Sequence, residues 1–207
     1  MTEIEVFKTL LDDYPSIVHD KYPFPKPFKG NGEIKAIILG ADPARILADG
    51  PQQFSTVFEL NNPKSPYWRG VGANIGQIQG VSMENIYVQN LCRNYFTKET
   101  SKNPQWIEIA RNYWIPFFSQ ELDFLFDRSI PIFITTEFIL KACLTGKERM
   151  KAREIYQSNR CISASENLFG RELFALYRHP AYSLKRWSTY SEFVSEKLKS
   201  TGKTLNQ

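Results

Sequence analysis

Two apolar runs, each as long as a β-strand and each followed by a turn with one reactive side chain, constrain this chain most. Residues 35–39 lead into Gly40 and Asp42, and residues 173–177 lead toward His179. Strands buried on both faces of a parallel sheet read as continuous apolar runs, and in open α/β sheets sites form at the carboxyl ends of the strands. A carboxylate and an imidazole at two such ends are candidates for an acid–base pair. The alternatives are a helix cap at Asp42 and an ordinary loop histidine.

The composition fits one domain with a full core. The chain has 207 residues, of which 42% are hydrophobic and 14% aromatic, which is more than a disordered chain carries. We expect residues 1–207 to form a single domain, with residues 1–33 as an N-terminal helix and a proline-rich extended segment packed on it. No apolar run reaches the roughly 18 residues that span a bilayer, and the first residues do not form a signal peptide. We therefore expect a cytoplasmic protein with no membrane partner.

The cysteines and the charge give weaker indications. Cys92, Cys143 and Cys161 lie far apart, whereas structural zinc or an iron–sulfur cluster needs about four ligands, so we expect buried structural cysteines and no metal. The net charge is +4, and basic residues gather in residues 141–160 and 178–203. A polyanion is therefore a plausible partner, although a charged run is also typical of a solvated helix face.

Strand and helix patterns alternate along the chain, which predicts a parallel or mostly parallel sheet covered by helices. Thr2 and Glu5 have the spacing of a capping box. Residues 40–66 are expected to form a long irregular loop. The fold class is therefore α/β, a three-layer α/β/α sandwich with a central four-stranded, mostly parallel sheet. The expected strands are 34–39, 86–91, 131–135 and 174–177, and the expected helices are 2–14, 72–79, 106–126 with a kink near Pro116, 138–144 and 188–199.

Short segments follow one another in the order of the motifs of one enzyme family. On these segments the chain resembles the uracil-DNA glycosylase superfamily, over nearly its whole length from Ile34 onward. The family motifs are a GQDPYH-like turn, an aromatic residue in a GLCFSV-like segment, a proline-rich loop with a short helix, an LLLN-like strand, and an HPSPLS-like loop. The matching segments here are Gly40-Ala41-Asp42-Pro43-Ala44-Arg45, Thr56-Val57-Phe58-Glu59-Leu60, Pro63-Lys64-Ser65-Pro66 with Asn74-Ile75, Tyr87-Val88-Gln89-Asn90, and His179-Pro180-Ala181-Tyr182-Ser183-Leu184.

The resemblance implies a role for each matching residue in breaking the bond between a base and its sugar. Asp42 would stabilise positive charge on the sugar and orient the attacking water, and His179 would donate a hydrogen bond to the departing base. Asn90 would read the edge of the pyrimidine, and Phe58 would stack on the flipped base. The pocket would also include Ala41 and Ala44. Asn90 as a simple turn residue and Phe58 as a core residue remain the alternatives.

Departures from the family motifs fall around these residues. Ala44 stands where the most uracil-specific branch has a tyrosine that blocks 5-substituted bases, so a roomier pocket is expected. Arg45 replaces a histidine, and Ala181 and Tyr182 replace the serine and proline of the last motif. The residues expected to contact DNA are Arg45, Arg178, Tyr182, Leu184, Lys185 and Arg186.

These observations favour a monofunctional DNA glycosylase that acts on uracil or a related damaged pyrimidine. It would need no cofactor, work as a monomer, and bind DNA as a single strand or as a duplex with a flipped base. The alternative is a non-catalytic member of the superfamily, a module that binds nucleic acid or protein. A hydrolase of free nucleosides or nucleotides is a third and weaker interpretation.

Overall fold

A five-stranded sheet forms the centre of the molecule. The computed structural model describes residues 2–43, 46–47, 50–146 and 150–203. The strands run in the order β1-β5-β2-β6-β7, and β5, β2, β6 and β7 are parallel to one another. Strands β3 and β4 form a separate small hairpin. The bounds are β1 Phe28–Lys29, β2 Ala36–Gly40, β3 Ile46–Leu47, β4 Gly50–Pro51, β5 Ile86–Asn90, β6 Ile132–Ile134 and β7 Leu173–Ala175.

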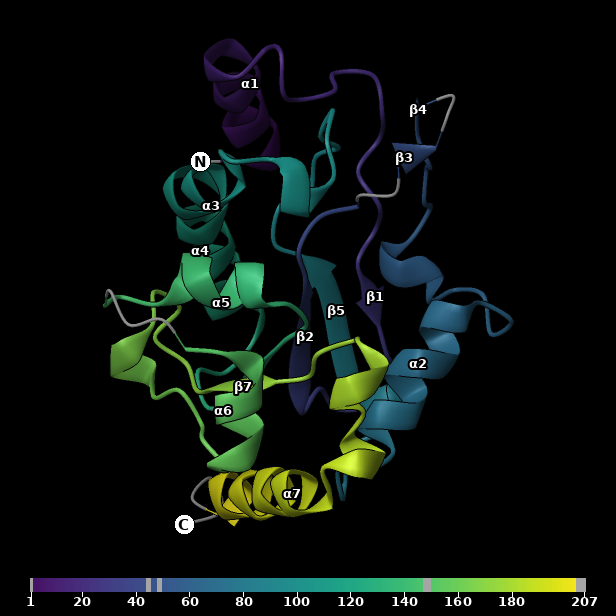
Figure 1. The fold of residues 1–207 in the computed structure, drawn as a ribbon, viewed down its shortest axis with the longest axis vertical. Helices are drawn as coiled ribbons and strands as arrows, with labels where there is room; N and C mark the ends of the chain where they lie inside the picture. Colours follow the sequence, from purple (N-terminus) through teal and green to yellow (C-terminus); the bar gives the residue numbers. More distant parts are fainter. Residues whose placement is uncertain (1, 44–45, 48–49, 147–149, 204–207) are drawn as a thin grey trace.

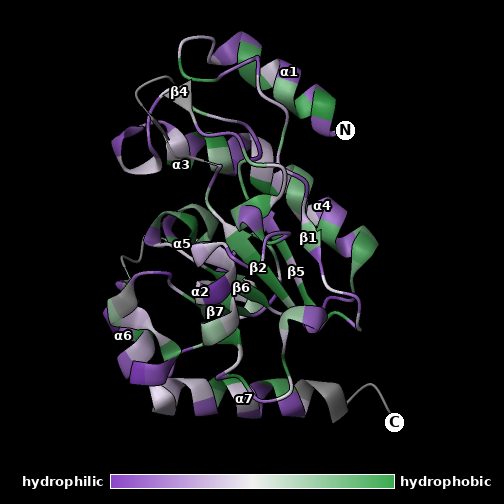
Figure 2. Ribbon diagram, turned by 90° about the vertical axis from the view of Figure 1, so that its right-hand side faces the viewer, coloured by the Kyte–Doolittle hydropathy of each residue, from purple (hydrophilic) through white to green (hydrophobic). Residues whose placement is uncertain are grey.

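Helices cover the sheet on both sides. In Figure 1, α2 lies on one side of the strands, α3 to α5 lie on the other, and α7 closes one end of the molecule. Figure 2 shows the hydrophobic strands at the centre and mixed colouring on the helices, as expected for helices with one buried face. The bounds are α1 Glu3–Asp13, α2 Pro66–Ile75, α3 Trp106–Ile109, α4 Ile115–Leu125, α5 Glu137–Cys143, α6 Ala152–Gln157 and α7 Ser188–Lys203.

The α/β class with a mostly parallel central sheet is confirmed, whereas the predicted number of four strands is wrong. The additional strand is β1, which pairs antiparallel with β5 at the edge of the sheet. It has two residues and follows the proline-rich segment, so it shows no strand pattern. The four predicted strands overlap β2, β5, β6 and β7. Each of these four strands is buried along its whole length.

The predicted helices differ from the observed ones mainly in two places. The helix expected over 72–79 is α2, which begins at Pro66 because the hydroxyl of Ser65 accepts a hydrogen bond from the backbone N–H of Tyr67. Proline is favoured in the first turn of a helix. The helix expected over 106–126 contains a π-helical turn at Ala110–Trp114, immediately before Pro116. The capping box at Thr2 and Glu5 is confirmed.

Two buried arginines hold peripheral elements to this core. The Arg93 guanidinium forms ion pairs with Glu3 of α1, at 2.6 Å, and with Glu121 of α4. Arg171 pairs with Asp123 at 3.0 Å and donates hydrogen bonds to backbone carbonyl oxygens around the end of α4. Unmet carbonyls at a helix end need such donors. Among the described residues, no helix is both long and apolar enough to cross a membrane.

Candidate functional site

The ends of the parallel strands bring the predicted site residues to one edge of the sheet. Gly40, the last residue of β2, is the register partner of Asn90, the last residue of β5. Thr135 follows β6, and its hydroxyl donates a hydrogen bond to the carbonyl oxygen of Leu39 at 2.7 Å. Arg178 follows β7 after three further residues. This convergence is the reason sites form at the carboxyl edge of such sheets.

A cavity of about 120 Å³, here called the small cavity, opens at this edge. A water molecule takes about 30 Å³ in the liquid, so the small cavity suits one ring-sized group. A second cavity of about 660 Å³, the larger cavity, adjoins it. Tyr67, Thr135, Thr136 and Arg178 line both. The small cavity is also lined by Pro25, Ala41, Asp42, Pro43, Phe54, Val57, Phe58, Asn90 and Thr100.

Asp42 has the environment of a proton-accepting group. Its Oδ1 accepts a hydrogen bond from the hydroxyl of Thr100, whereas its Oδ2 is buried without a hydrogen-bond partner. Burial raises the pKa of Asp42 to about 7, and the Thr100 hydrogen bond and the positive charge of Arg178 oppose that rise. A carboxyl whose pKa lies near neutrality can both accept and release a proton under ordinary conditions.

Asn90 faces Gly40 across the two neighbouring strands. The Oδ1 of Asn90 is buried and has no hydrogen-bond partner, although the residue is only 2% exposed. A Cβ at position 40 would collide with this Oδ1 and would lie 2.6 Å from Cζ of Phe58. The absence of a side chain at Gly40 therefore makes the space in which Asn90 and Phe58 sit. A buried acceptor without a partner is rare in proteins and is expected where a ligand supplies the donor.

Phe58 reaches the site through an unusual backbone. Both Phe58 and Glu59 have positive φ angles, 55° and 51°, a conformation that costs of order 1–3 kcal/mol for a residue other than glycine. The ring of Phe58 stacks near that of Tyr67, with centroids 6.2 Å apart. The Arg178 guanidinium lies over both rings, at 4.8 and 4.9 Å from their centroids. The three side chains together cover Asp42 from the side of α2.

His179 occupies a different position from Asp42. It lines the larger cavity and is not among the residues of the small cavity. Its side chain is exposed, and its Nδ1 accepts a hydrogen bond from the backbone N–H of Ala181 at 3.2 Å. The neighbouring residue, Arg178, is the one whose charge acts on Asp42. The two residues predicted as an acid–base pair thus line adjoining cavities that share the Arg178 wall.

The residues predicted to contact DNA fall into three groups. Lys185 and Arg186 are exposed, and Tyr182 is half-buried at the larger cavity. Leu184 is only 1% exposed and packs in the core, so in this structure it does not face solvent. Arg178 lies over the aromatic rings described above. The predictions for Ala44 and Arg45 concern residues outside those that the structure describes.

Sequence reasoning did not identify Thr100, Thr135 or Tyr67 as site residues. Thr135 follows a predicted strand, so the strand-end argument used for Asp42 could have found it. Thr100 lies in a short 3-10 turn between β5 and α3, where no pattern marks it. Within the described part of the chain, no cluster of His, Cys, Asp and Glu could hold a metal ion. No protein-family profile matches this chain, and no curated protein matches it.

Proposed function

We propose that this protein is a DNA glycosylase of the uracil-DNA glycosylase type, which hydrolyses the bond between deoxyribose and uracil or a related damaged pyrimidine. One observation carries the proposal: Asp42, Asn90 and Phe58 line a single ring-sized cavity together with Arg178. A flat base fits against the ring of Phe58. The free Oδ1 of Asn90 can accept a hydrogen bond from a pyrimidine N–H, and the amide NH₂ can donate to the adjacent carbonyl.

In the proposed reaction the bond from the sugar C1′ to the base nitrogen breaks, and its electron pair leaves with the base. Positive charge then develops on the sugar, and the Asp42 carboxylate would stabilise it and accept a proton from the attacking water. The new bond joins C1′ to the water oxygen. Because Asp42 acts as a carboxylate and its pKa is about 7, activity should rise with pH through that region.

The departing base carries negative charge, and two side chains are placed to stabilise it. Arg178 lines the small cavity and is permanently charged. His179 lines the adjoining cavity and could donate to the base from its rim. The positions favour a larger contribution from Arg178 than from His179. This assignment differs from the family resemblance, in which the histidine stands alone.

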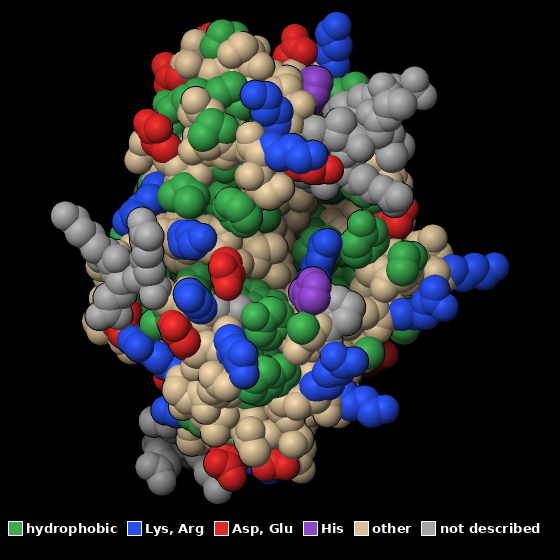
Figure 3. Space-filling model, in the orientation of Figure 1, with side chains coloured by type: hydrophobic (Ala, Val, Ile, Leu, Met, Phe, Trp, Pro, Cys, Tyr) green, Lys and Arg blue, Asp and Glu red, His purple; other side chains and the backbone are tan. Residues whose placement is uncertain are grey.

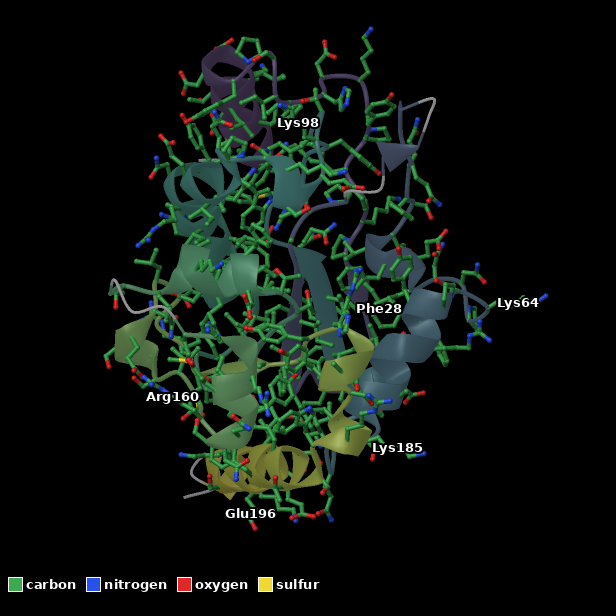
Figure 4. The ribbon with its side chains drawn as sticks, in the orientation of Figure 1. Phe28, Lys64, Lys98, Arg160, Lys185 and Glu196 are labelled. Carbon is green, nitrogen blue, oxygen red and sulfur yellow. The ribbon has the colours of Figure 1, made fainter. Side chains whose placement is uncertain are left out.

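Exposed basic side chains on the side of α2 would hold the DNA backbone. Figure 4 shows Lys64 and Lys185 pointing outward on this side of the molecule. Figure 3 shows a hollow near the middle of the same view, with hydrophobic, basic and histidine side chains around it. Arg69 and Arg186 are also exposed. A base would have to leave its stack to enter, which costs a few kcal/mol and is easiest in a single strand or at a mismatch.

The deciding experiment measures excision from oligonucleotides that carry one uracil, as a single strand and in a mismatched duplex. Asp42→Asn should lower the rate at least about 100-fold, because general base catalysis typically contributes that much or more. Arg178→Gln should lower it more than His179→Ala does. Asp12→Asn is the matched control, since Asp12 is an exposed carboxylate on α1. Full activity of Asp42→Asn would refute the mechanism, and no excision of any pyrimidine would refute the enzyme.

A second candidate is a non-catalytic binding module of the same superfamily. The observation that favours it is the position of His179 outside the small cavity. Such a module would bind uracil-containing single strands more tightly than thymine-containing ones without releasing the base. The same oligonucleotides therefore separate the two candidates when binding and excision are measured side by side.

A further inference from the structure

The larger cavity has no part in the chemistry proposed above, although it adjoins the small cavity. Its volume of about 660 Å³ falls within the roughly 300–1,000 Å³ of cavities that bind small ligands. Its walls are mostly apolar or aromatic, with Tyr67, Val71, Phe138, Leu176 and Tyr182 among them. Flat aromatic groups suit such walls, because ring stacking is available from several sides.

Only side chains separate the two cavities. Tyr67 and Arg178 line both, so an occupant of each cavity could touch the same ring from different sides. Bases of one strand stack about 3.4 Å apart, and two bases on either side of one ring therefore lie about 7 Å apart. Neighbouring nucleotides of an unstacked strand can span that separation.

The polar groups of the larger cavity fit a neutral partner with a few hydrogen-bonding atoms. The hydroxyl of Tyr177, a wall residue, is buried without a partner, and the residue is 3% exposed. Asn74 is held in place because its Oδ1 accepts the backbone N–H of Leu184 at 3.0 Å. The charged walls are mixed, with Glu137 opposite in sign to Arg178. A nucleobase, rather than a phosphate, matches this combination.

We propose that the larger cavity binds the base of the nucleotide next to the excised one in the same strand, with the Tyr177 hydroxyl as a hydrogen-bonding group. The identity of the first base rests on the function proposed above. The second site makes the protein a reader of two adjacent bases, in which the base beside the damage adds to the affinity.

A matched pair of tryptophan variants tests the cavity without altering the small one. Gly70 lies on α2, lines the larger cavity, and has nothing within 4 Å of the position a Cβ would take. Gly70→Trp should therefore fill the cavity without a backbone collision. Ala73→Trp is the control, because Ala73 is exposed on the same helix and lines neither cavity. Thermal melting of both variants checks that the fold is kept.

The measurement uses five-residue single strands of tetrahydrofuran abasic residues with 2′-fluoro-2′-deoxyuridine at the centre, because that sugar resists loss of its base. Affinity is compared with and without a thymine beside the central residue, on the 5′ side and then on the 3′ side. We expect the second base to tighten binding about tenfold on one side, the scale of one stacked base, in wild type and in Ala73→Trp. The gain should disappear in Gly70→Trp.

The outcomes separate this proposal from the function on which it rests. No gain in wild type, or an equal gain in Gly70→Trp, overturns the second site even if uracil is excised. A gain that Gly70→Trp abolishes supports it even if no base is ever released, in which case only the enzyme is refuted. Tyr177→Phe is the second variant, since it removes only the buried hydroxyl. It should reduce the gain about threefold without lowering the melting temperature, and an unchanged gain refutes the role of Tyr177.

Discussion

The hydroxyl of Thr100 donates a hydrogen bond to Oδ1 of Asp42, and it is the direct hydrogen-bond partner found for that carboxylate in the described structure. The two residues are 58 positions apart and meet at the wall of the small cavity. The hydrogen bond favours the ionised carboxylate, whereas burial favours the protonated acid, and burial has the larger effect. The proton occupancy of Asp42 near neutral pH therefore depends on this contact.

The first prediction concerns Thr100→Val, which keeps the shape of the side chain and removes its hydroxyl. Loss of the donor should raise the pKa of Asp42 above its value of about 7. Because the carboxylate is the active form, the rise of excision rate with pH should move to higher pH. The pH–rate profile of the variant beside wild type measures this shift. Thr97→Val, at an exposed threonine in the same connecting segment, should leave the profile in place.

The second prediction concerns the stability of the fold, which needs no substrate. The pKa of Asp42 is raised from an ordinary value near 3.9 to about 7 in the folded protein, so the folded state binds more protons between these values. The free energy of unfolding should therefore fall as pH rises from about 4 to 7, by at most about 4 kcal/mol. Asp42→Asn should abolish that part of the fall. Denaturant unfolding at pH 5 and pH 8 tests it, and equal pH dependence in both proteins would show that Asp42 titrates normally.

The third prediction compares two glycines. A Cβ at Gly40 would meet Asn90 and Phe58, whereas a Cβ at Gly70 would meet nothing within 4 Å. Gly40→Ala should destabilise the fold by about 1–3 kcal/mol through overpacking and weaken binding of the base. Gly70→Ala should stabilise α2 by about 1 kcal/mol, the difference in helix propensity. Chemical denaturation of both variants gives the comparison, and effects of the same sign would contradict it.

The fourth prediction concerns the DNA backbone. Lys185 and Arg186 are exposed in the turn before α7, and each phosphate contact contributes about 1 to the salt dependence of binding. Reversal of both charges to glutamate should lower the magnitude of that slope by about 2. Lys98→Glu is the control, since Lys98 lies near the opposite end of the molecule in Figure 4. An unchanged slope in the double variant would place the DNA elsewhere.

The fifth prediction concerns base choice at Ala44, which lies outside the described residues. A smaller residue where the uracil-specific branch has tyrosine should admit 5-hydroxymethyluracil at a rate comparable to that of uracil. Ala44→Tyr should restore a preference for uracil of about 1–3 kcal/mol, the range for rejection by shape. Rates on both substrates for both proteins measure this preference. Exclusion of 5-substituted bases by wild type would mean that another side chain guards the pocket.

Much of the fold could be predicted because the four parallel strands are buried on both faces and therefore appear as apolar runs. The edge strand β1 could not, since two residues leave no periodicity. The beginning of α2 was missed for a different reason. The Ser65-Pro66 pair is a helix start, but the surrounding prolines resemble a loop.

The site was predictable only as far as the strand ends. Asp42 and Asn90 follow from the rule that sites form where parallel strands finish, and both line the small cavity. Which of two consecutive residues turns toward Asp42 depends on the path of the chain after β7, and it is Arg178 rather than His179. Thr100 could not be foreseen, because its contact depends on how a distant turn packs.

The wall between the two cavities is made of side chains, including Tyr67 and Arg178, whereas the floor of the small cavity is made by strand ends. Rotation of one guanidinium about its flexible stem would join the cavities, while the sheet stayed fixed. The size of molecule that this edge accepts is therefore set by a movable partition. A single substitution at Arg178 could convert a chamber for one ring into a channel for a whole dinucleotide, without any change to the fold that supports it.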